Sequence, residues 1–84
     1  MAMANTVNFT WDDPNPAGTV DHYDLYIDDV LNQSVNVTSA SVDLPAGTNY
    51  TAYVEAVGTS GLRSLPSDPL SFYTLQIIMN LRLN

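Results

Sequence analysis

The residues that could support chemistry are few, and most lie in the first third of the chain. His22 is the single histidine and follows Asp21, which makes it the one conventional candidate for a general base. The chain has neither cysteine nor lysine, so thiolate and amine nucleophiles are absent. Because the spacing suggests no nucleophile for His22, we interpret it as a surface residue of a strand and expect no catalytic residues and no enzyme.

Three carboxylates could approach one another around the loop from Asp12 to Gly18. Asp12, Asp13 and Asp21 offer the oxygen ligands that Ca²⁺ prefers. Their spacing matches no calcium-binding loop, however, and aspartate is common in turns because it bonds its own backbone. We expect no metal site and no cofactor, although the sequence leaves open whether this acidic loop binds a cation.

Charge and hydropathy exclude several classes of function. Nine acidic residues against two arginines give a formal net charge of −7. Such a surface repels phosphate groups, so we expect binding to neither nucleic acid nor an anionic membrane. No run approaches the roughly 20 apolar residues of a membrane span. Residues 1–5 lack the basic and apolar regions of a signal peptide, so we expect the chain to stay where it is made or to leave within a particle.

Alternation with a period of two predicts an all-β fold. At 84 residues the chain has the length of one domain. Short strands at 8–12-residue spacing with Pro, Gly and Asp between them are typical of a sandwich or barrel. The apolar residues that predict the successive strands are Val7, Phe9 and Trp11; Tyr23, Leu25 and Ile27; Val35 and Val37; Val42 and Leu44; Tyr50, Ala52, Val54 and Ala56; and Leu70 and Phe72.

The alternation changes phase near Thr74. Leu70 and Phe72 are even-numbered, whereas five apolar residues of 75–84 are odd-numbered: Leu75, Ile77, Met79, Leu81 and Leu83. A one-residue slip sends side chains to the opposite face of a sheet. We therefore divide the chain into a body, residues 1–74, and an amphipathic C-terminal strand, residues 75–84, that either completes its own sheet or contacts another subunit.

Several segments in order resemble a fibronectin type III domain. The run from Leu44 to Val57 looks like the turn, corner tyrosine (Tyr50) and sixth strand of that family, and Trp11 sits where the family has its core tryptophan. The resemblance implies an immunoglobulin-like β-sandwich in which the Tyr50 hydroxyl bonds backbone a few residues upstream. The expected structural core is Phe9, Trp11, Tyr23, Leu25, Leu44, Tyr50 and Val54.

Two departures from that family lead to a hypothesis of function. The residues before Val7 are too few for a full first strand, and the tail adds ten residues beyond the family's end. A truncated first strand leaves a sheet edge open, and an open edge recruits another strand. We expect partner-binding residues at Leu75, Ile77, Met79, Leu81 and Leu83, with Arg63 either an interface anchor or a simple ion-pair partner of Asp68.

The sequence thus favours a non-catalytic assembly protein with protein partners. We expect a homo-oligomer or a member of a larger assembly, with a capsid decoration protein of a bacteriophage virion as the leading case and the virion as its location. The alternative is a ligand- or carbohydrate-binding module of a secreted or cell-surface protein, with outward-facing tyrosines at 26, 53 and 73 stacking on sugars.

Overall fold

A computed structural model describes residues 4–76, 78–79 and 81–83. The described residues form six strands and no helix, which confirms the all-β prediction. The strands are β1 (Ala4–Thr10), β2 (Val20–Ile27), β3 (Val30–Val35), β4 (Ser39–Pro45), β5 (Asn49–Gly58) and β6 (Leu70–Tyr73). No helix in this part of the chain is long and apolar enough to cross a membrane.

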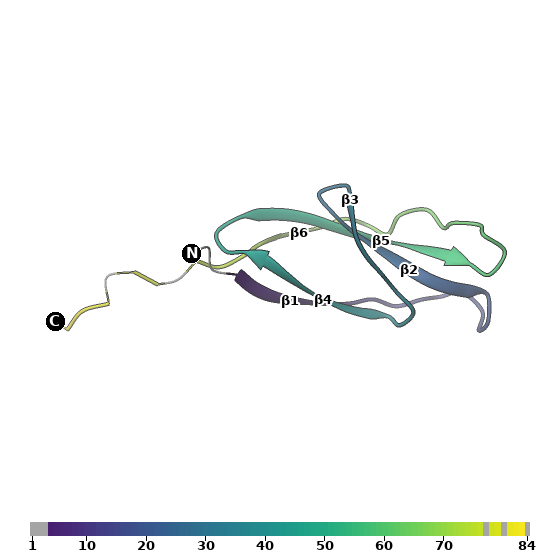
Figure 1. Cartoon of the computed structure of the whole chain (residues 1–84), viewed down its shortest axis with the longest axis horizontal. Helices are drawn as coiled ribbons and strands as arrows, with labels where there is room; N and C mark the ends of the chain where they lie inside the picture. Colours follow the sequence, from purple (N-terminus) through teal and green to yellow (C-terminus); the bar gives the residue numbers. More distant parts are fainter. Residues whose placement is uncertain (1–3, 77, 80, 84) are drawn as a thin grey trace.

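The strands form two sheets that face each other as a sandwich (Figure 1). One sheet contains β1 and β4, paired antiparallel from Ala4 opposite Pro45 to Thr10 opposite Ser39. The other has the order β3-β2-β5-β6, with every pair antiparallel. This is the predicted immunoglobulin-like, fibronectin type III-like architecture.

Alternating residues of both sheets build the core between them. Of the predicted core, Phe9, Tyr23, Leu25 and Leu44 are buried, and Leu25 is only 1% exposed. The other three predicted core residues, Trp11, Tyr50 and Val54, are partly buried and pack against this cluster. Aromatic rings link the two sheets, since Phe9 meets Phe72 edge to face at 5.5 Å and Trp11 meets Tyr23 at 5.6 Å.

The structure corrects the prediction for the Tyr50 hydroxyl. Within the described residues this hydroxyl has no hydrogen bond to upstream backbone, and the ring instead packs against Phe72 at 5.9 Å. The turn between β4 and β5 is held by Thr74, which is 3% exposed. Thr74 Oγ1 accepts a hydrogen bond from Thr48 N (3.0 Å) and lies 2.7 Å from Pro45 O, to which it donates.

The β2–β3 connection explains the Asp28-Asp29 pair. Both residues have positive φ, 50° and 65°, as the two-residue turn of a tight hairpin requires. Asp28 Oδ1 also accepts from Thr51 N at 2.9 Å, which ties the hairpin to β5. The paired strand β3 ends at Val35, so the predicted strand position of Val37 is wrong. Val37 lies in the following turn and is 56% exposed.

The C-terminal segment leaves the body of the sandwich (Figure 1). Its described residues, 75–76, 78–79 and 81–83, have no strand partner within the described chain. The principal extents of 61 × 22 × 21 Å reflect this projection. A predicted strand over 75–84 is therefore not formed by these residues in the single chain, because no neighbouring strand lies beside them.

Candidate functional site

The first feature of the candidate site is the exposed apolar tail. Its described apolar side chains are Leu75, Ile78, Met79, Leu81 and Leu83, with exposed fractions between 73% and 99%. Ile77, predicted as a partner-binding residue, lies outside the described residues. A run of this kind left in water favours association, since burying apolar surface is the main driving force of protein contacts.

Two contacts hold the start of the tail against the body. Asn5 Nδ2 donates to the carbonyl oxygen of Leu75 at 2.8 Å. The Gln76 side chain lies over Gly47, so close that a Cβ added there would come within 2.5 Å of it. The tail therefore leaves the sandwich beside the beginning of β1.

The second feature is the open edge of β1. Among the described strands β1 pairs with β4 alone. Gln33 Nε2 bonds Ser41 O at 3.1 Å, so β4 lies over β3, whereas the Phe9–Phe72 contact places β1 over β6. The unpaired edge of β1 therefore faces the β6 side of the sandwich.

The third feature is a groove at the far end of that edge, beside Phe9 and Thr10 of β1 and the residues that follow them. Two adjoining hollows of about 440 and 330 Å³ share Trp11, Asp12, Val54 and Ser67. Their walls are chiefly apolar and aromatic, with Asp12, Asp13 and Asp68 near the far end of β1. Trp11 Nε1 is buried here without a hydrogen-bond partner in the described chain.

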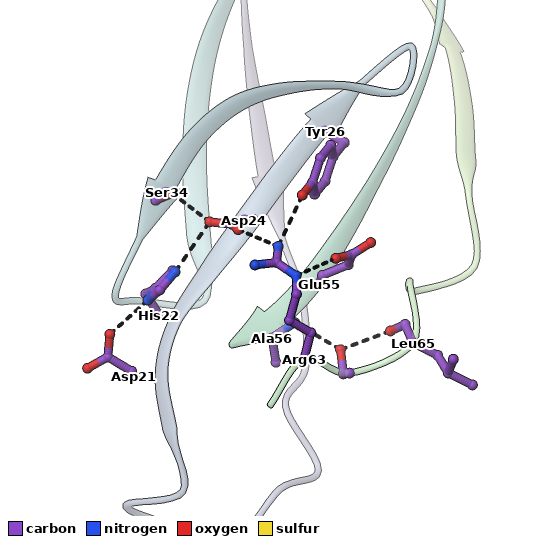
Figure 2. Close-up of polar contacts among 10 residues, drawn as sticks. Asp21, His22, Asp24, Tyr26, Ser34, Glu55, Ala56, Arg63 and Leu65 are labelled. Carbon is purple, nitrogen blue, oxygen red and sulfur yellow. Dashed lines mark hydrogen bonds and ion pairs between the residues drawn. The ribbon is translucent and has the colours of Figure 1, made fainter. Parts of the chain in front are cut away.

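A separate polar cluster covers the outer face of the four-stranded sheet (Figure 2). Arg63 Nη2 lies 2.5 Å from Asp24 Oδ2, and Arg63 Nε lies 3.1 Å from Glu55 Oε1. The Asp24 side chain is only 7% exposed, and its Oδ1 also accepts from Ser34 Oγ at 2.5 Å. The predicted pairing of Arg63 with Asp68 is thus wrong, because the bridge between Val57 and Arg63 directs the guanidinium across β5 towards β2.

These contacts set the ionisation of the cluster. Burial raises the pKa of the Asp24 carboxyl, but hydrogen bonds from Ser34 and Arg63 outweigh it, so the net pKa lies below the usual 3.8. The hydrogen bonds that Arg63 donates to Asp24 and Glu55 raise the pKa of its guanidinium group. Arg63 is therefore a structural cation here, and its role as a partner-binding anchor stays a prediction.

His22 belongs to the edge of the same cluster. Its Nδ1 lies 2.7 Å from Asp21 Oδ2 and its Nε2 lies 3.5 Å from Asp24 Oδ1. Two carboxylates flank the ring, and no serine, threonine or tyrosine hydroxyl that the structure describes is bonded to it. This arrangement supplies no activated nucleophile.

Two of the three carboxylates considered for a cation, Asp13 and Asp21, are turned to other partners. Asp13 accepts from the backbone and side chain of Asn15 and from the Tyr23 hydroxyl, and the bond from Tyr23 lowers the pKa of Asp13 while raising that of Tyr23. Asp21 faces His22. In the described part of the chain no three acidic, histidine or cysteine side chains are grouped so as to hold a metal.

Comparison with known families decides the classification. The family described as the fibronectin type III domain matches residues 2–73, most of the chain. The chain belongs to the fibronectin type III family. No curated protein and no solved structure matches it significantly. Fibronectin type III domains are typically non-catalytic binding modules.

Two elements of this fibronectin type III domain were missed by sequence reasoning. The groove joins residues more than 50 positions apart, and the sequence contains no local signal for it. The Asp24–Arg63 pair spans 39 positions. Its one signal was an aspartate between apolar neighbours in the most buried strand, where a charge needs a partner.

Proposed function

We propose that this fibronectin type III domain is a non-catalytic assembly module that binds other protein subunits through its C-terminal tail. In its specific form, the proposal is an accessory or decoration protein of a bacteriophage capsid. The observation that carries it is the tail: five described apolar side chains, exposed by 73% or more, project from an otherwise closed sandwich.

The energetics favour a covered tail. Burying a Leu, Ile or Met side chain contributes about 1.5–3 kcal/mol. Several such side chains on one segment are enough to offset the ordering of a short strand against a partner. A small domain buries a modest share of its surface, so it gains more than a large one from such a contact.

The surface charge supports a protein partner. With a net charge of −7, the chain resists non-specific association with nucleic acid and with other acidic surfaces. The body would then face solvent in an assembly while the apolar tail makes the contact. The virion case rests on analogy with fibronectin-like modules on phage particles.

A second candidate function is binding of a carbohydrate or another flat ligand. The rings of Tyr26 and Tyr53 stack at 4.9 Å and 13° on the outer face of the larger sheet. The Tyr26 hydroxyl is engaged by Arg63 Nη2 at 3.0 Å, and the hollows lie elsewhere, beside β1. Quenching or shifting of tyrosine fluorescence by an oligosaccharide, abolished by Tyr53→Ala, would support this candidate.

The experiment that tests the proposal is the solution mass of the intact chain and of a chain ending at Thr74, measured by light scattering with a urea unfolding curve for each. We expect an oligomer for the intact chain and a folded monomer for the truncated one. Two monomers of equal stability would rule out an assembly role of the tail by itself. An unfolded truncation would show that the tail stabilises its own domain instead.

A further inference from the structure

We infer that the groove beside β1 is the docking site for the tail of a second copy of this chain, which pairs with the open edge of β1 and fills the groove with its apolar side chains. The inference rests on the proposed function and names its partner. It joins three features: the unpaired edge of β1, an apolar groove at the far end of that edge, and an exposed amphipathic segment that leaves the body beside its beginning.

The groove fits the side chains of an added strand. Its hollows lie between the edge of β1 and the segment from Ser64 to Leu70, where Phe9, Trp11, Leu25, Ala52, Val54 and Leu70 contribute to the walls. A strand beside β1 directs every second side chain between the sheets. Every odd-numbered residue of the tail from 75 to 83 is apolar, so that face suits this space, while Ile78 lies on the opposite face.

The chain's own tail is poorly suited to this site. It starts beside the beginning of β1, at the Asn5–Leu75 contact, and runs away from the body (Figure 1). To lie along its own β1 it would have to reverse at once. The segment from Thr74 to Met79 contains no Gly, Pro, Asn or Asp, the residues that tight turns favour.

In a dimer of two copies that face each other, the tail needs no turn to reach a β1 edge. Each tail then continues straight into the partner's groove, entering at the beginning of β1 and running parallel to it. Residues 75–83 extended span about 30 Å, which exceeds the about 23 Å of β1. The exchange is reciprocal, so it closes with two-fold symmetry.

The alternation fixes the register. In β1 the odd-numbered Val7 and Phe9 point inwards, and Trp11 follows in phase. Offsetting the tail by 70 residues places Met79 of one copy beside Phe9 of the other and Leu81 beside Trp11, all directed between the sheets. A shift of one residue would instead direct Ile78, Asn80 and Arg82 between the sheets, and two of these three are polar.

The proposed register also brings opposite charges together. The same offset places Arg82, one of two cations in the chain, beside Asp12, with Asp13 and Asp68 at the same end of the groove. A tail running the opposite way would carry Arg82 to the other end of β1. The parallel, reciprocal arrangement is therefore the one that pairs the charges.

Cross-linking between singly substituted chains tests the inference directly, because the natural chain has no cysteine. Asn8 and Ile78 are solvent-exposed and are opposite each other in the proposed register, and neither faces the groove. Full-length N8C and I78C chains are refolded together and oxidised, and the linked peptides are mapped. The matched control is S41C with I78C, since Ser41 lies beside Asn8 but on β4, one strand farther from the tail.

We expect a disulfide between Asn8→Cys of one chain and Ile78→Cys of another, at least about fivefold more abundant than in the control. An internal disulfide in the double variant N8C/I78C, with none between mixed chains, would overturn the inference in favour of the chain's own tail. If the intact chain is an oligomer, the truncated chain is a monomer and neither cross-link forms, then the tail binds another surface of the partner chain. That outcome overturns the groove as docking site and leaves the proposed function standing.

A charge swap supplies an independent readout. Asp12→Arg should weaken the dimer by about fivefold or more in its dissociation constant, and Asp12→Arg with Arg82→Asp should restore it. Equal weakening in both variants would contradict the proposed register. The dissociation constant is measured by light scattering over a dilution series.

Discussion

Arg63 Nη2 lies 2.5 Å from Asp24 Oδ2 and thereby joins the segment after β5 to the centre of β2. The pair is asymmetric, since the Asp24 side chain is 7% exposed and that of Arg63 is 43% exposed. A buried carboxylate depends on its partners much more than an exposed guanidinium does. The pair therefore stabilises the fold chiefly by compensating Asp24.

Replacing Asp24 should show this dependence. Asp24→Ala removes the acceptor of Ser34 and Arg63 and should lower the free energy of unfolding by about 1–3 kcal/mol. Arg63→Met should also destabilise, because it leaves the Asp24 carboxylate without its cation. The double variant should lose less free energy of unfolding than the sum of the losses in the two single variants. Urea unfolding measures all three losses. Strict additivity would show that the two groups do not act as a pair.

Acid should weaken the fold through the same carboxylate. The pKa of Asp24 is lowered in the folded state, so its ionised form contributes stability above the unfolded pKa of about 3.9. That contribution is lost as the pH falls through the lower, folded pKa. The urea midpoint should therefore decrease as the pH is lowered from about 5 through the unfolded pKa, and it should decrease less steeply in Asp24→Asn. An equal slope in both proteins would assign the acid sensitivity to other carboxyls.

Thr74 should be a stabilising residue through its hydroxyl. Thr74→Val keeps the shape of the side chain but removes the hydrogen bonds with Thr48 N and Pro45 O. The free energy of unfolding should therefore decrease by about 1–2 kcal/mol. Thr74→Ser retains the hydroxyl and serves as the control. Thermal unfolding followed by circular dichroism measures both. A valine variant as stable as the serine variant would contradict this role.

Gly47 and Gly18 form a matched pair for testing the anchor of the tail. Both have positive φ, 73° and 82°, but a side chain at Gly47 would meet Gln76, whereas nothing lies near Gly18. Substitution of either glycine by alanine should lower the free energy of unfolding by about 1 kcal/mol, because alanine disfavours a positive φ. Gly47→Ala should in addition increase the protease sensitivity of the bond after Gln76. Equal protease sensitivity in the two variants would show that Gln76 does not anchor the tail.

Local pattern in the sequence determined most of the fold. Period-two alternation depends only on neighbouring residues, which is why Phe9, Leu25 and Leu44 were recognised as core and why the break in phase at Thr74 separated the tail. The match of residues 2–73 to the fibronectin type III family agrees with that interpretation. The amphipathic character of the tail is likewise a property of its sequence alone, whereas its exposure became known only from the structure.

Tertiary structure decided which distant groups meet. Arg63 pairs with Asp24 and Glu55 rather than with nearby Asp68, because the register of β5 against β2 sets which side chains share a face. The Tyr50 ring packs on Phe72. The hydrogen bond that stabilises the β4–β5 turn is made by the Thr74 hydroxyl instead of the Tyr50 hydroxyl. The groove exists only because β1 stacks over β6 with no strand beside it in the described chain, a consequence of sheet order that no local pattern contains.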